Sequence, residues 1–168
     1  MNNTWRTHPE TPGDIAAIRE VTLAAFPTAQ EADIIDLLRT KPEAWVDGLS
    51  QVATDPDGQV VAHCLATRCV IGQGEALMLG PVAVLPAWQK RGAGTAVVTA
   101  CLAEAKRQGE QFVVLVGHPT YYPRFGFTRA DRHGIGVGID CPPEAVMALS
   151  LNGDPLPAGV IHAPAFGL

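Results

Sequence analysis

A glycine-rich turn stands directly before a predicted helix in this 168-residue chain. An apolar strand pattern precedes the turn, and Gly92 and Gly94 open the helix. Backbone N–H groups in the first turn of a helix lack intrahelical acceptors, and glycine lets an anion come close to them. The spacing therefore predicts a phosphate-binding turn. Its residues are Gln89, Lys90, Arg91, Gly92, Ala93, Gly94 and Thr95.

Two common phosphate-binding motifs do not fit this turn. A P-loop needs a lysine after its last glycine, and Thr95 follows Gly94 here. A dinucleotide fingerprint needs a third glycine where this chain has Val97, and its first glycine follows the strand at once. A nucleotide-binding α/β domain is therefore disfavoured. The remaining alternative to a phosphate site is an ordinary glycine-rich loop that caps the helix.

The run from Gln89 to Gly94 is a Q-x-x-G-x-G motif, which resembles the signature of the GNAT acyltransferase superfamily. The text V-A-V-x-P before it also fits that family. Downstream, the run Y-Y-P-R-F-G-F from Tyr121 to Phe127 resembles the family's F-Y-x-x-x-G-F. The two motifs stand in the family's order, and the resemblance covers roughly residues 59–130.

The resemblance implies a fold and a reaction. The expected fold is α/β (α+β by some schemes), with a mixed central sheet of about six or seven strands and about four flanking helices. The sheet would combine an antiparallel N-terminal meander with a splayed parallel pair, residues 75–85 and 112–116. Acetyl-CoA would bind in the splay as acyl donor, with its pyrophosphate on the turn. An acceptor amine would then attack the thioester directly, without a covalent enzyme intermediate.

The resemblance also implies roles for particular residues. The family polarises the thioester carbonyl with a backbone N–H of the bulged strand, which here points to Val82, Ala83 or Val84. Tyr122 occupies the family's tyrosine position and would protonate the leaving thiolate, because a phenol with a pKa of ~10 is neutral near pH 7. The alternative for Tyr122 is packing of a short helix, which is also the expected role of Tyr121. The candidates for the base that deprotonates the acceptor are Glu75, His63, His118 and water.

Apolar periodicity and turn residues predict the elements that carry these motifs. Helices are expected over residues 15–25, from Thr28 to before Pro42, over 93–108 and, as a short element, over 119–125. Strands are expected over residues 4–8, 49–54, 59–71, 75–85, 112–116, 126–128 and 145–151. Residues 153–168 are rich in glycine and proline and predict an ordered tail. Gly80-Pro81 predicts a bulge or a loss of pairing, since proline cannot donate to a strand ladder.

Composition indicates one globular domain over residues 1–168. Hydrophobic residues make up 47% and charged residues 17%, and no apolar run approaches the ~20 residues of a membrane span. The N-terminus shows no secretory signal. The four cysteines form no C-x-x-C pair, which predicts reduced thiols and a cytoplasmic location. No metal site is predicted.

The charge distribution favours a cationic acceptor. The net charge of −5 argues against a nucleic-acid partner. Residues 1–60 contain 10 acidic and 4 basic side chains, whereas residues 61–168 contain 7 and 8. An ordinary solvated surface is the alternative explanation. The sequence thus predicts an N-acetyltransferase acting on a small-molecule or peptide amine, as a monomer or homodimer. The alternative function is a non-catalytic acyl-CoA-binding or sensing module on the same fold.

Overall fold

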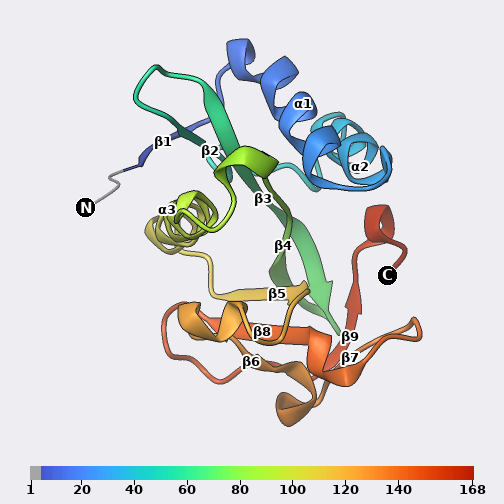
Figure 1. Cartoon of the computed structure of the whole chain (residues 1–168). Coiled ribbons are helices and arrows are strands. Elements are labelled where there is room, and N and C mark those ends of the chain that lie inside the picture. Colours follow the sequence, from blue (N-terminus) through green and yellow to red (C-terminus); the bar gives the residue numbers. More distant parts are fainter. Residues whose placement is uncertain (1–4) are drawn as a thin grey trace. The chain divides into compact units, whose positions relative to one another are not determined.

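Figure 1 shows the computed structural model of the chain, which describes residues 5–168. These residues fall into two compact units. Unit 1 contains residues 5–66 and 80–105, and unit 2 contains residues 67–79 and 106–168. The long strands β3 (Val60–Ile71) and β4 (Gly74–Val84) each contribute residues to both units. The expectation that residues 1–168 form a single domain stays a prediction.

Unit 1 combines antiparallel strands with helices. Besides its parts of β3 and β4, it contains β1 (Arg6–Pro9), α1 (Ile15–Ala25), α2 (Gln30–Arg39), β2 (Ser50–Thr54) and α3 (Ala93–Arg107) up to residue 105. β1 pairs with β2, and β2 with β3, both antiparallel. Thr4, expected to begin the first strand, lies outside the described residues. Within residues 5–168, no helix is both long and apolar enough to cross a membrane.

The β2–β3 hairpin of unit 1 closes through the turn that its sequence predicts. The Asp55 carboxylate accepts hydrogen bonds from the N–H groups of Asp57 and Gln59, both at 2.9 Å. Such a side-chain to backbone bond is the reason aspartate favours turns. Gly58 completes the turn with φ at +86°, a conformation that glycine adopts without steric cost.

Helices cover both faces of the strands in unit 1. In Figure 1, α1 and α2 lie on one side of β2 and β3, and α3 lies on the other. Cys64 of β3 and Cys101 of α3 are both fully buried, and burial, followed by the neighbouring Cys101, raises the pKa of Cys64. Its neighbour His63 points to the opposite face, because side chains alternate along a strand. The buried apolar residues of unit 1 include Ile18, Val21, Ile35, Leu38, Val52, Leu65, Val97 and Val98.

Unit 2 is built mainly from strands. Besides its parts of β3 and β4, it contains β5 (Phe112–Val116), β6 (Thr128–Arg129), β7 (Ile135–Val137), β8 (Val146–Ser150) and β9 (Gly159–His162). β4 runs parallel to β5, with Leu77 opposite Val113 and Met78 opposite Val114. β8 is antiparallel to β5 and β6, while β9 pairs antiparallel with β3 and parallel with β7. Its buried core includes Met78, Val114, Ala148 and Ile161.

The architecture confirms the expected fold class and adds detail to it. The pairings join nine strands into a mixed sheet, more than the six or seven expected. Residues 5–168 contain three α-helices instead of about four, because the expected fourth helix is only a 3₁₀ turn at Tyr122–Phe125. The additional strands are β7 and β9, and β9 lies within the expected tail. The backbone of β4 is irregular at Gly80, where φ is +134°. This is the position at which Gly80-Pro81 predicted a bulge or a loss of pairing.

Candidate functional site

The predicted anion-binding turn lies in unit 1, between β4 and α3. A 3₁₀ turn at Pro86–Trp88 follows the strand, and α3 begins at Ala93. The Ala96 N–H donates to the Gly92 carbonyl at 2.9 Å, which is an i→i−4 bond at the start of the helix. The N–H groups of Ala93 and Gly94 precede that bond and lie at the positive end of the helix dipole. An anion at this position is stabilised by both effects.

Two residues of the turn have a left-handed backbone. The φ angle is 62° at Lys90 and 93° at Gly92. Among the described residues, Lys90 is the only non-glycine residue with a positive φ. Such a conformation costs on the order of 1–3 kcal/mol and is concentrated at functional sites and ligand clamps. The strained residue thus lies within the segment that sequence spacing assigned to phosphate binding.

Side chains fix the turn to its surroundings. Gln89 Nε2 donates to the Val84 carbonyl at 3.1 Å, so this amide links the turn to the end of β4. The Arg91 guanidinium lies over the Trp88 ring, 5.3 Å from its centroid, where a cation is attracted to the ring face. Lys90 and Arg91 are both exposed, so the surface of the turn is positively charged.

Trp5 also contacts the turn, and the sequence analysis missed it. Its indole Nε1–H donates to the Arg91 carbonyl at 3.1 Å across a separation of 86 positions. No local pattern could have signalled this contact, because periodicity and turn motifs report only on neighbouring residues.

The direction of the β4 backbone narrows the choice of thioester-polarising N–H groups. The Leu85 N–H donates to the Val61 carbonyl of β3 at 2.8 Å, whereas the Val84 carbonyl is bonded by Gln89 instead. Backbone N–H groups point to alternate sides along a strand. The N–H groups of Val82 and Val84 therefore point away from β3, and that of Ala83 points toward it. Of the three candidates, Val82 and Val84 therefore present their N–H groups away from the β3 ladder.

Tyr122 lies in unit 2, at the start of the 3₁₀ turn that follows β5. Its ring packs edge-to-face against Phe127 and Tyr121, at centroid distances of 6.0 and 5.0 Å. Gly117 makes room for it, because a Cβ at Gly117 would lie 2.7 Å from Tyr122 Cε2. The ring is half-buried, so its position is determined by packing on several sides.

Comparison with known proteins places the chain in a family. The model of the acetyltransferase (GNAT) domain matches residues 46–129. An N-acetyltransferase of Escherichia coli K12, YjhQ, itself uncharacterized, is 37% identical over 125 residues, which cover 71% of this chain and 67% of that protein. The chain belongs to the GNAT acetyltransferase family.

Solved structures agree with this assignment. A GNAT family acetyltransferase from Brucella melitensis, in complex with acetyl-CoA, has a TM-score of 0.79 and 32% identity to this GNAT chain. The alignment covers 98% of this chain and 99% of that one. The GNAT family N-acetyltransferase YhbS from Escherichia coli, in complex with CoA, has a TM-score of 0.87 at 22% identity, covering 100% and 96%. At that identity the second likeness shows the fold alone.

His63, one candidate base of this GNAT protein, is enclosed in a hydrogen-bonded cluster. Its Nε2 lies 2.8 Å from Ser50 Oγ, and the Ser50 hydroxyl in turn donates to the Glu10 carboxylate. Arg39 of α2 donates to both oxygens of Glu10, at 2.9 and 3.2 Å. Because the Ser50 proton goes to Glu10, the Ser50 oxygen accepts from the His63 Nε2–H. His63 Nδ1 has no hydrogen-bond partner among the described residues.

The environment of His63 keeps it neutral. Burial, and then the positive charge of Arg39, lower the pKa of His63 to about 3. An imidazole with such a pKa does not take up a proton near neutral pH. The other two candidates, Glu75 and His118, lie in unit 2 with exposed side chains. Within residues 5–168, no group of three or more histidine, cysteine or acidic side chains is arranged to hold a metal ion.

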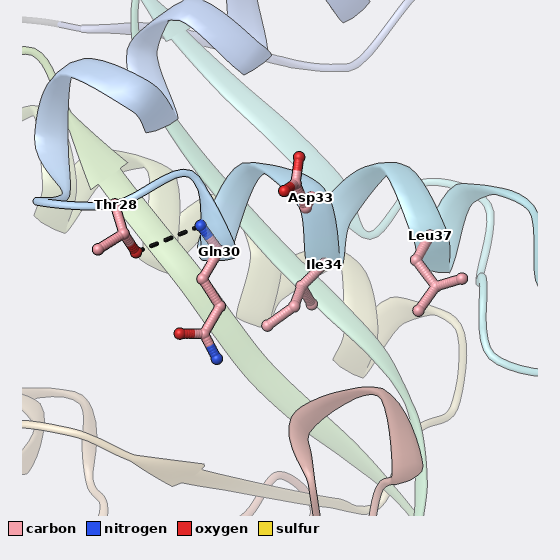
Figure 2. A pocket seen from close by; sticks show the side chains of 5 residues that line it. All are labelled: Thr28, Gln30, Asp33, Ile34 and Leu37. Atoms are coloured by element: carbon pink, nitrogen blue, oxygen red, sulfur yellow. Dashed lines mark hydrogen bonds between the residues drawn. The ribbon is translucent and has the colours of Figure 1, made fainter.

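A hollow of about 520 Å³ runs along α2 in unit 1. It is lined by Thr28, Gln30, Asp33, Ile34 and Leu37. Figure 2 shows Gln30, Ile34 and Leu37 on one side of the helix, as their spacing requires. The dashed line marks the bond from the Gln30 N–H to Thr28 Oγ1, at 3.3 Å, which satisfies a backbone donor at the helix start.

Proposed function

We propose that this GNAT protein transfers an acetyl group from acetyl-CoA to a primary amine by direct attack on the thioester. The observation that carries the proposal is the turn at residues 89–95. Its left-handed Lys90 and Gly92 precede a helix whose first N–H groups lie at the positive end of its dipole. The acetyl-CoA complex of the Brucella relative, at 32% identity, supports acetyl-CoA as the donor.

The chemistry needs a donor to the thioester oxygen and an acid for the leaving thiolate. We assign the first role to the N–H groups of Val82 and Val84, since both point away from the β3 ladder. We assign the second to Tyr122, on the strength of its match to the family motif and its packed ring. Burial and the low pKa of His63 argue against it as the base, which favours Glu75, His118 or water.

The acceptor is proposed to be cationic and to approach unit 1. Unit 1 carries 11 acidic and 6 basic residues, whereas unit 2 carries 6 of each. A surface with one dominant sign of charge raises the local concentration of an oppositely charged substrate. A protonated amine fits that field, and a small-molecule or peptide amine satisfies it equally. A cytoplasmic location and a monomeric or homodimeric state remain predictions from the sequence.

Calorimetry with acetyl-CoA tests the donor site directly. Gly92→Leu should abolish measurable binding, because its Cβ would already lie 3.4 Å from Trp5 Nε1 and the larger side chain would displace the turn. Gly58→Leu is the matched control: its φ of +86° imposes similar backbone strain, but within residues 5–168 its Cβ would have no atom within 4 Å apart from its chain neighbours. Equal affinities in the wild type and Gly92→Leu would overturn the assignment.

A panel of amines, with release of free CoA as the readout, tests the reaction. Turnover with at least one primary amine, dependent on Tyr122, is the expected result. Tight acetyl-CoA binding without turnover across the panel would instead favour the acyl-CoA-binding or sensing module.

A further inference from the structure

Trp5 joins the N-terminal segment of unit 1 to the anion-binding turn. Its Nε1–H donates to the Arg91 carbonyl at 3.1 Å. Its ring packs edge-to-face on Trp88, with the centroids 5.4 Å apart and the planes at 81°. Trp88 also lies beneath the Arg91 guanidinium. The two indoles and Arg91 thus form one contact cluster.

The hydrogen bond from Trp5 determines the direction of a second group. In a trans peptide, the carbonyl of one residue and the N–H of the next point in opposite directions. The Arg91 carbonyl and the Gly92 N–H belong to the same peptide plane. With the carbonyl held toward Trp5, the Gly92 N–H points to the other side of the turn.

This peptide plane is one that needs to be held. Lys90 and Gly92 on either side of Arg91 have φ angles of 62° and 93°. Glycine adopts positive and negative φ with similar ease, so Gly92 on its own permits the plane to rotate. The Trp5 donor opposes that rotation, because the rotation would break its hydrogen bond to the Arg91 carbonyl.

The indole also closes one side of the turn. A Cβ built on Gly92 would lie 3.4 Å from Trp5 Nε1 and 3.9 Å from Cδ1. A ligand therefore reaches the Gly92 backbone from the side that Trp5 leaves open, which is the side toward which the Gly92 N–H points.

We propose that Trp5 is a positioning residue for the pyrophosphate of the acyl donor. It acts through the Arg91–Gly92 peptide plane, and does not itself touch the thioester. This inference rests on the proposed function, because it assumes that the turn binds a pyrophosphate.

Trp5→Phe is the informative variant, since it keeps an aromatic ring facing Trp88 while it removes the N–H donor together with the five-membered ring that carries it. Loss of one neutral hydrogen bond should weaken CoA binding by about 2- to 10-fold in calorimetry. The matched control is Trp45→Phe. Trp45 lies in the same unit but packs against Arg39, with the guanidinium 5.1 Å from its ring centroid. Its variant should bind CoA as the wild type does.

A donor without a pyrophosphate separates positioning from general damage. S-acetylpantetheine carries the same thioester arm as acetyl-CoA but has no pyrophosphate. Trp5→Phe should lower kcat/KM for acetyl-CoA and leave kcat/KM for S-acetylpantetheine unchanged. Equal losses with both donors, or an unchanged Kd for CoA, would overturn the role of Trp5.

A spectroscopic readout does not depend on activity. The Trp5 indole N–H resonance in a ¹⁵N–¹H spectrum should shift when CoA is added, while that of Trp45 should not. A Trp5 resonance that stays fixed in CoA-saturated protein would contradict the proposal. Absence of CoA binding in the wild type would be a different result, since it would overturn the proposed function and the role of Trp5 with it.

Discussion

At the scale of single residues, this chain concentrates unusual backbone and buried polar groups in unit 1. The turn holds the strained Lys90, and the sheet face beneath α2 holds the cluster of His63, Ser50 and Glu10. Only the first belongs to the ligand site that we propose. The second is buried, and burial and then the charge of Arg39 lower the pKa of His63 to about 3.

Tyr122→Phe tests the proposed general acid. A thiol with a reference pKa of ~8.5 leaves readily as thiolate, so protonation assists its departure without being essential. The expected loss of kcat is therefore about 10²-fold, near the lower end for general acids. Acetyl-CoA affinity should barely change, because phenylalanine keeps the ring contacts with Tyr121 and Phe127. Tyr121→Phe is the control and should be nearly silent. Full kcat in Tyr122→Phe, with chemistry rate-limiting, would return Tyr122 to a packing role.

The buried His63 predicts a pH dependence of stability. Its pKa is about 3 in the folded protein, by burial and then by the charge of Arg39, and ~6.5 when unfolded. Between these values the unfolded state binds more protons. The contribution of this pKa difference to the free energy of unfolding is therefore fully present above pH ~6.5. It falls toward pH 3, by at most about 1.4 kcal/mol per pH unit.

Urea unfolding at several pH values isolates this contribution. His63→Gln removes the titrating group, so its free energy of unfolding should decline less steeply below pH 6 than that of the wild type. If the free energy of unfolding of the two proteins depends on pH in the same way, the pKa of His63 does not differ between the folded and unfolded states.

At the scale of elements, local pattern predicted most strands and helices to within one or two residues. β5, observed at Phe112–Val116, is a continuous apolar run, and α3 carries an apolar stripe that ends before Gly109. The failures are elements whose existence depends on a distant partner. β9 has only four residues in a glycine- and proline-rich segment, and it forms because β3 and β7 accept it. Trp5 was missed for the same reason.

Gly159→Ala tests this account of β9. A Cβ at Gly159 would lie 2.7 Å from both the Cα and the N of Gly72, so the two backbones must separate. Gly153→Ala is the matched control, since Gly153 also has a positive φ, but its Cβ would have no atom of the described residues within 4 Å apart from its chain neighbours. Strain alone should cost on the order of 1 kcal/mol in the control. Gly159→Ala should lower the free energy of unfolding by clearly more, and equal losses would mean that the strand contact contributes nothing.

At the scale of the whole molecule, the acidic residues are distributed unevenly between the two units. The acidic excess predicted for residues 1–60 belongs to unit 1, which also carries the anion-binding turn with its basic Lys90 and Arg91. The net charge of unit 1 is thus negative, while the turn itself is basic. Under the proposed function, this combination would let an anionic donor and a cationic acceptor bind to different parts of unit 1.

Salt dependence tests this division. For a cationic acceptor, kcat/KM should fall as ionic strength rises, because the Debye length shrinks to about 10 Å at 0.1 M.

Asp33 lines the hollow on α2, and Asp33→Asn should lower kcat/KM at low salt by up to about fivefold, the range of one exposed charge interaction. Asp154→Asn is the control, since Asp154 lies in the balanced unit 2, where it accepts a hydrogen bond from Asn152. A preferred acceptor that is anionic, or a kcat/KM that is flat between low and high salt, would contradict a cationic acceptor. An equal effect of both variants would place the attraction in the net charge of the chain and not in unit 1.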